Sequence, residues 1–389
     1  MVSGLVRRIC WKILALFPSS WKSLLLALYD NQPPICKNIQ SWSKRQSDVA
    51  CTLIQSSETF QRKPPKTLET EIHPSFLNRL KYKTPTKYLA CIPNTKLIGE
   101  YGLAILPDGS YALEGIWQES LLEKLPAYSS RSYRHKMRSR TQKKSGAYYS
   151  LMSLWCEGYY HWLHDVLPRL YLILEWLPED IQFVVPANLK QYQYNSLNLM
   201  GIKEEQLVLF GGDEVWELEI LYFSPPTTQT GWDAPAVNKW LQKLMFSRCN
   251  VDSLKQNRDK RIYISRCLAK HRRIKNDREV EACLKCYGFE TYLPEEMPFQ
   301  DQVLLFSQAE IIVASHGAGL ANLLFTPPGT LVLEIFEQTV VRACYWSMSE
   351  SLEHQYWYLI GETVDNPIEP DIWVPVEKLV QSLNQMFDR

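Results

Sequence analysis

Two histidine motifs contain the side chains best suited to catalysis or to binding a ligand. In the first, which covers residues 159–169, His161 and Asp165 stand four positions apart. On a helix such residues share a face, so the carboxylate can orient the imidazole. An imidazole that an acid holds near its titration point can take a proton from a hydroxyl group. The pair is therefore a candidate general base.

Other interpretations of this motif remain open. His161 could be a core histidine with its hydrogen bonds satisfied, or the aromatic residues around it could simply pack at a helix start. A third alternative is a metal site with His161, His164 and Asp165 as ligands. The sequence offers no further ligand cluster to complete such a site. We therefore expect no bound metal.

The second motif begins with an apolar run at residues 311–314 and continues as Ser315-His316-Gly317-Ala318-Gly319. This order predicts a buried strand that enters a helix through a small loop. Glycines let backbone N–H groups approach an anion, and a helix start adds unpaired N–H groups and the positive end of its dipole. The motif is a candidate phosphate cradle, although small residues at such a turn also serve mere packing.

Two further loops should reach this cradle, because the carboxyl ends of parallel strands meet at one edge of a sheet. The strand expected at 261–265 delivers Ser265, Arg266 and Arg273, and the strand expected at 331–336 contains Glu334. Arginine forks suit phosphate oxygens, and a carboxylate suits a ribose diol. Together the loops predict a nucleotide-diphosphate site. The alternative is that the arginines pair with surface acids and Glu334 caps a strand.

Both motifs need a scaffold, and the hydrophobic pattern predicts one that alternates strands and helices. In the first half it predicts strands at residues 88–92, 96–99, 103–106, 147–155, 181–185, 206–210 and 219–223, and helices at 159–177, 191–200 and 236–246. In the second half it predicts strands at 261–265, 289–293, 311–314 and 331–336, and helices at 277–287, 298–309, 318–325 and 375–387. This rhythm is typical of an α/β protein with doubly wound sheets.

A chain of 389 residues exceeds the comfortable size of one hydrophobic core, so we expect two domains. We place Rossmann-like domains at residues 88–250 and 251–389. Residues 1–87 form an N-terminal lead-in, rich in Pro, Ser, Gln and Lys after residue 31, that wraps over a domain.

The composition excludes some partners. Lys and Arg number 43 against 42 Asp and Glu, a net charge of +1, which argues against nucleic acid. The 10 cysteines are scattered, which favours a reducing compartment. Residues 1–29 mix cations and tryptophans with an interrupted apolar stripe, which fits an interfacial helix or an ordinary packed one. The basic run at 131–144 is either a solvated loop or a contact for an anionic acceptor or membrane.

Taken together, the motifs resemble glycosyltransferase family 61 in order and spacing. The segments that carry the resemblance are residues 160–170, 263–266, 272–277, 315–322 and 334–335, and its coverage runs from about residue 88 to the C-terminus. Two departures are visible. Glu157-Gly158 stands where members often carry an Asn before the first histidine, and Asp277 stands where a Glu commonly follows Asn276.

The resemblance implies a glycosyltransferase B fold, in which two doubly wound Rossmann-like domains face each other across a cleft. It implies an inverting, metal-independent transfer from a nucleotide sugar, usually a UDP-sugar, as co-substrate without a further cofactor. His161 and Asp165 match the acceptor-side catalytic motif, which lies in the domain at 88–250. The donor-binding motifs match Ser265, Arg266, Arg273, His316, Gly317, Gly319 and Glu334, with Ala318 between the two glycines.

We expect the acceptor to be a glycan or a lipid-linked glycan, such as a growing capsular or exopolysaccharide. The expected location is the cytoplasm at the inner face of the plasma membrane, with residues 1–29 as a peripheral contact. Two other classes compete. A dinucleotide-binding oxidoreductase would need a third glycine where Asn322 stands and would leave His161 without a role. A non-catalytic sugar-binding protein is the other.

Overall fold

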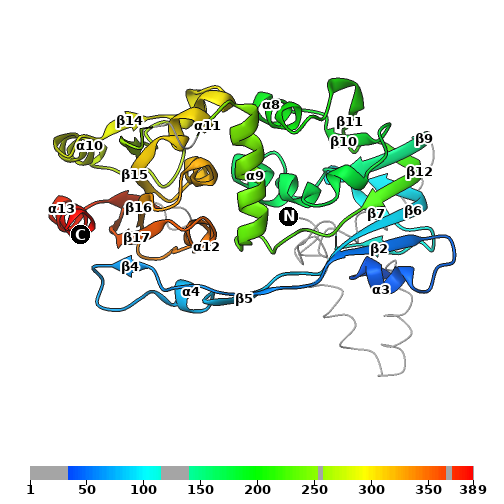
Figure 1. Cartoon of the computed structure of the whole chain (residues 1–389), viewed down its shortest axis with the longest axis horizontal. Helices are drawn as coiled ribbons and strands as arrows, with labels where there is room; N and C mark the ends of the chain where they lie inside the picture. Colours follow the sequence, from blue (N-terminus) through cyan, green and yellow to red (C-terminus); the bar gives the residue numbers. More distant parts are fainter. Residues whose placement is uncertain (1–33, 115–139, 253–256, 365–369, 389) are drawn as a thin grey trace, which may run out of the picture.

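The computed structural model describes residues 34–114, 140–252, 257–364 and 370–388. The N-terminal segment 1–29 and residues 131–139 of the basic run lie outside the described residues. The described part contains two large sheets, which lie on either side of the long helix α9 (Pro235–Arg248) (Figure 1). No helix in the described ranges is both long and apolar enough to cross a membrane.

The first sheet is mixed. Its parallel part consists of β12 (Val215–Phe223), β9 (Thr141–Ser150), β10 (Gln182–Pro186) and β11 (Leu207–Phe210), in that order. On the other side of β12 follow β6 (Lys87–Ile98), β7 (Leu103–Ile105) and β8 (Tyr111–Ala112), each antiparallel to the strand before it; β1 (Ile35–Cys36) then pairs parallel to β8. The parallel strands send their carboxyl ends toward one edge, where the first histidine motif lies.

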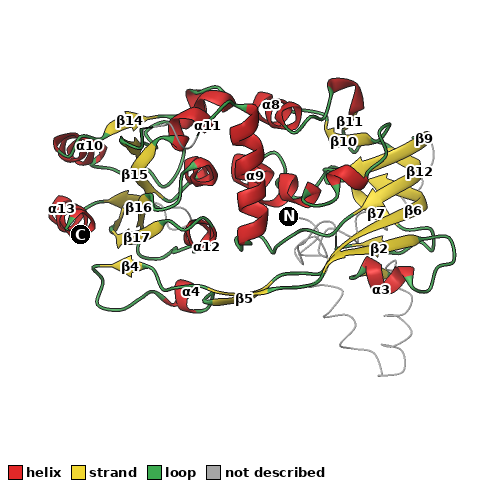
Figure 2. Cartoon of the chain, viewed as in Figure 1, coloured by secondary structure: helices red, strands yellow, loops and turns green. Residues whose placement is uncertain are grey.

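The second sheet is parallel throughout. Its order is β14 (Glu290–Tyr292), β13 (Lys260–Ile264), β15 (Ala309–Ser315), β16 (Leu331–Phe336), β17 (Gln355–Ile360) and β4 (Lys66–Thr67). Helices cover both of its faces, as parallel sheets require. Figure 2 shows the sheet between α10 (Asp277–Cys286) and α13 (Val376–Phe387) on one side and α11 (Phe299–Ser307) and α12 (Cys344–Ser351) on the other.

The alternation of side chains along β15 and β16 separates two cores. Ile311 and Val313 point into the core under α10 and α13, whereas Ile312 and Ala314 point into a larger core. That larger core also holds residues of the first half, among them Leu163 and the α9 residues Leu241 and Met245. The two sheets therefore rest against one continuous apolar interior.

The lead-in ties the two sheets together along the lower side of Figure 1. Its strand β2 (Ala50–Gln55) pairs with β6 of the first sheet, and β4 joins the second sheet. Between them, β3 (Thr59–Gln61) and β5 (Lys81–Lys83) form a two-stranded ribbon, and α4 (Pro74–Leu77) packs against the second half. Residues 35–87 thus supply strands to both sheets.

Several expected elements differ from those observed. The helix expected at 159–177 is broken into α7 (Tyr159–His161), a π-helical turn (Trp162–Val166) and two 3₁₀ turns (Leu167–Leu170 and Leu174–Trp176). The reason is Pro168, which has no N–H to donate and crowds the carbonyl four residues earlier. Leu172, with a φ of 62°, then reverses the backbone.

Other differences arise where pairing or local geometry overrides the hydrophobic pattern. The strand expected at 147–155 ends at Ser150 and begins at Thr141, inside the basic run, because residues 141–149 pair with β12. The two strands expected at 88–92 and 96–99 are one strand, β6, in which Asn94 has a φ of 52°. The segment at 318–325 is a 3₁₀ helix, and the pattern missed α12 and β17 altogether.

Phe76 of α4 anchors the lead-in on the second half. Its side chain is fully buried, with ring centroids 4.7 Å from Tyr358 and 5.6 Å from Trp346. We expect Phe76→Ala to lower the free energy of unfolding by about 3–5 kcal/mol, because it removes apolar contacts and leaves a cavity. Urea unfolding measures this. The neighbouring Leu77 is 46% exposed, so Leu77→Ala is the matched control; equal losses for both variants would contradict the docking of α4.

Candidate functional site

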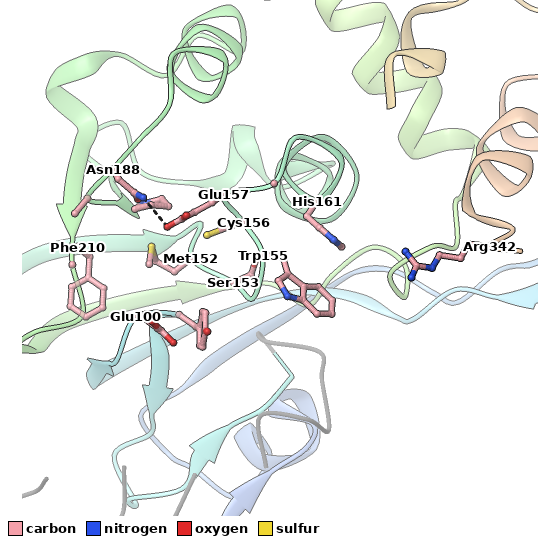
Figure 3. Close-up of a pocket in the computed structure, with 15 residues that line it drawn as sticks. Glu100, Met152, Ser153, Trp155, Cys156, Glu157, His161, Asn188, Phe210 and Arg342 are labelled. Carbon is pink, nitrogen blue, oxygen red and sulfur yellow. Dashed lines mark hydrogen bonds between the residues drawn. The ribbon is translucent and has the colours of Figure 1, made fainter. Parts of the chain in front are cut away.

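Two adjoining cavities lie where the carboxyl ends of the parallel strands of the two sheets approach each other. The larger, of about 1140 Å³, lies at the ends of β9, β10 and β11 (Figure 3). The smaller, of about 580 Å³, lies against the loops that follow β13 and β15 and against α4. Gly158, His161 and Arg342 line both cavities. These three residues therefore mark the junction.

His161 and Asp165 meet as the sequence predicts. Gly158 precedes α7 with an extended backbone, and the chain then enters the π-helical turn that carries Asp165. His161 Nδ1 lies 2.6 Å from Asp165 Oδ2, and the same oxygen accepts a 3.3 Å hydrogen bond from the Thr230 hydroxyl. Because the carboxylate occupies Nδ1, the ring's other nitrogen, Nε2, is left for the cavities that His161 lines.

His164 faces a different neighbourhood. Its ring is buried, with Nε2 3.3 Å from the Ala321 carbonyl and Nδ1 3.6 Å from Asp233 Oδ1. His164 therefore does not join His161 and Asp165 around one point. Across the described ranges, no group of three or more His, Cys, Asp or Glu side chains could hold a metal ion.

The second motif forms the wall of the smaller cavity, which His316, Gly317 and Ala318 line. Gly317 has a φ of 176°, an extended conformation that any residue adopts. A glycine is therefore needed here because a side chain would not fit, and not because of its backbone freedom. A Cβ on Gly317 would lie 1.9 Å from Arg266 Nη1. A Cβ on Gly319 would lie 2.9 Å from Ile264 Cγ2. The two glycines thus seat the loop against Arg266 and against β13.

A buried hydrogen-bond chain fixes the His316 ring. Its Nδ1 lies 2.5 Å from Glu334 Oε1, and the Tyr356 hydroxyl donates to Glu334 Oε2 at 2.5 Å. Burial raises the pKa of Glu334 well above its ordinary value, and burial lowers the pKa of His316. Both shifts favour the uncharged forms of the two groups, and the tautomer of the His316 ring decides whether Nδ1 or Oε1 donates the hydrogen bond between them.

Three arginines act on this ring through their positive charge. Burial is the largest cause of the lowered pKa of His316, and the charges of Arg272, Arg342 and Arg266 lower this pKa further. Arg272 and Arg342 line the smaller cavity. Arg266 is held by the backbone carbonyls of His271, at 3.0 Å from Nη2, and of Arg272, at 3.4 Å from Nε. This concentration of positive charge beside backbone amides suits a phosphate group.

Sequence reasoning chose Arg273 in place of its neighbour Arg272 as a donor residue, and it missed Arg342. Arg272 begins the segment 272–277 that carries the family resemblance, and its backbone is left-handed, with a φ of 58°, which the sequence did not reveal. Arg342 lies in the loop between β16 and α12, where no periodic pattern exists to place it.

Three predicted donor residues, Arg273, Ser265 and Glu334, form hydrogen bonds with other side chains of the protein. Arg273 donates from Nε and Nη2 to Asp371 Oδ2, at 3.3 and 2.9 Å. The Ser265 hydroxyl donates to Asp277 Oδ2 at 3.0 Å. Glu334 is fully buried, and both of its oxygens are engaged as described above. None of the three lines the smaller cavity, so direct contact of these residues with a donor stays a prediction.

Comparison with known proteins assigns part of the chain to a family. The family model for Glycosyltransferase 61 matches residues 159–333. No curated protein matches the chain. The matched segment starts at the first residue of α7 and ends within β16, so it includes the His161–Asp165 pair and the loop at 316–319. The resemblance is thereby confirmed: the segment that carries both histidine motifs belongs to the glycosyltransferase 61 family, and the chain is a glycosyltransferase.

Proposed function

We propose that the chain transfers a sugar from a nucleotide-sugar donor, a UDP-sugar, to a hydroxyl group of a glycan acceptor with inversion and without a metal. The observation that carries this proposal is the position of His161 on the walls of both cavities. A base that serves a single displacement must reach the attacking hydroxyl at the point where donor and acceptor meet.

The smaller cavity is the proposed donor site. Arg272 and Arg342 would bind the diphosphate together with the amides of the loop at 316–319 and the His316 ring. As the bond from the anomeric carbon to the phosphate oxygen breaks, the diphosphate leaves with the electron pair. The fixed guanidinium groups and amides stabilise that negative charge, which is the part a metal ion plays in other transferases.

The larger cavity is the proposed acceptor site. The acceptor oxygen attacks the anomeric carbon from the side opposite the diphosphate, which inverts the configuration. His161 takes the hydroxyl proton at Nε2, and Asp165 stabilises the positive ring through its hydrogen bond to Nδ1. Asp165 orients the ring in the same way, so both residues contribute to one proton transfer.

On this view the architecture is of the glycosyltransferase B type, with an acceptor domain at 88–250 and a donor domain at 251–389. The lead-in supplies strands to both. We further propose a glycan or lipid-linked acceptor in capsular or exopolysaccharide synthesis at the cytoplasmic membrane face. The competing oxidoreductase finds no support at Asn322, which is buried and donates to Gln302 and to the Gly319 carbonyl where a third glycine would be needed.

The first test concerns the base. We expect His161→Ala to slow the hydrolysis of a UDP-sugar, read as UDP release from a panel of donors, by about 10²–10⁴-fold, because water in place of the acceptor also needs its proton removed. Asp165→Asn should lower kcat with little change in KM. Calorimetric titration with UDP is the control, and both variants should bind it as the wild type does. Unchanged hydrolysis in both variants would refute the assignment of the base.

The second test concerns the cradle. Gly317→Ala should weaken UDP binding about tenfold or more, because the new Cβ would displace the Arg266 guanidinium from the loop. Calorimetry of Gly317→Ala, Arg266→Ala and the double variant forms a cycle. If the methyl group acts through Arg266, the double variant loses no more affinity than Arg266→Ala alone. Additive losses, or no loss from Gly317→Ala, would argue against the cradle.

A further inference from the structure

Trp155 is an exposed tryptophan on the wall of the larger cavity. Its side chain is 47% exposed, although tryptophan is usually well buried. The residue also has a φ of 62°, which is a genuine outlier for a bulky side chain. A large apolar ring that is both exposed and held in an unfavourable backbone conformation points to a role in binding.

The backbone ties this ring to the helix that carries His161. The Gly158 N–H donates to the Trp155 carbonyl at 2.8 Å, and the Trp162 N–H donates to the Gly158 carbonyl at 2.8 Å. A Cβ on Gly158 would lie only 3.3 Å from the Trp155 carbonyl and 3.4 Å from His161 Cδ2. The tight turn at Gly158 therefore fixes the position of the indole relative to the proposed base.

The indole lies next to the imidazole. The ring centroids of Trp155 and His161 are 4.9 Å apart, with an angle of 37° between the ring planes. In Figure 3 both side chains lie on the side of the cavity nearest Arg342, which lines the donor cavity as well. A ring stacked on the indole would have its edge beside His161.

Another part of the cavity wall carries a polar pair of side chains. Asn188 Nδ2 donates to Glu157 Oε1 at 3.0 Å, and Figure 3 shows this pair across from Trp155. The Glu157 backbone carbonyl accepts hydrogen bonds from Lys190 Nζ at 2.8 Å and from the Tyr192 hydroxyl at 2.7 Å, which hold the residue in place. Glu100 also lines the cavity. Carboxylates accept hydrogen bonds from hydroxyl groups.

We propose that the larger cavity is a pyranose subsite, in which Trp155 stacks on the C–H face of the acceptor's terminal sugar and thereby presents one of its hydroxyl groups to His161. A pyranose has an apolar C–H face and a rim of hydroxyl groups, which matches an indole on one side and the Glu157–Asn188 pair on the other. Trp155 is then a positioning residue. This inference rests on the proposed function, because it takes His161 as the base.

Saturation-transfer NMR with three simple probes tests the subsite. Methyl β-D-glucopyranoside, methyl β-D-galactopyranoside and methyl α-D-mannopyranoside are added separately to the full chain with UDP. We expect at least one glycoside to bind, with the strongest saturation on the protons of one C–H face. Trp155→Asn removes the ring and tolerates the positive φ; it should weaken binding at least tenfold, and Trp155→Phe should weaken it less.

Trp176 provides the matched control, because it is 60% exposed and lines neither cavity. Trp176→Ala should bind the glycoside as the wild type does. Thermal unfolding checks that each variant is folded. If none of the glycosides binds the wild type, or if Trp155→Asn binds as well as the wild type, the pyranose subsite is wrong.

Donor assays on the same samples separate this inference from the proposed function. Trp155→Asn should retain UDP binding, because the indole does not line the donor cavity. UDP binding and UDP-sugar hydrolysis without any glycoside binding would overturn the pyranose subsite alone. Glycoside binding that depends on Trp155, without UDP binding or hydrolysis, would overturn the proposed function and with it the role of Trp155 in presenting a hydroxyl to His161.

Discussion

The apolar interior shared by the two sheets is the constraint on which the site depends. Leu163, next to the His161–Asp165 pair, lies in the same core as Phe325 and Trp346 of the second half. The carboxyl ends of the parallel strands in both sheets are thereby held close enough for His161 to line a cavity on each side. The lead-in adds strands to both sheets, so it restrains their relative position at a second place.

The two cavities also differ in the charge of their walls. On the proposed donor side, the hydrogen bond between His316 and the buried Glu334 lies in the field of three arginines, and burial makes a charge on either partner costly. A neutral ring there adds no fourth positive charge. On the proposed acceptor side the wall includes an indole and a carboxylate–amide pair, which suits an uncharged polyhydroxyl ligand.

The sequence predicted those parts of the site that local order controls. The i, i+4 spacing brought His161 to Asp165, and the strand–loop order placed Gly317 on a cavity wall, because both depend on short-range geometry. The sequence could not show that Arg272 lines the cavity and Arg273 does not, because the left-handed backbone of Arg272 decides which of the two side chains faces it. Glu334 was identified as important, but its partner Tyr356 lies on β17, an element that the hydrophobic pattern did not predict.

The broken helix at 159–177 shows why such misses concentrate near the site. A regular helix would satisfy the hydrophobic pattern, yet Pro168 forbids it, and the chain adopts a π-helical turn and two residues with positive φ, Trp155 and Leu172, on either side of the motif. These features cost free energy locally and persist because the shared core over-determines the backbone around them. Their effect is to hold His161 beside an exposed indole at the junction of the two cavities, a placement that no regular element would give.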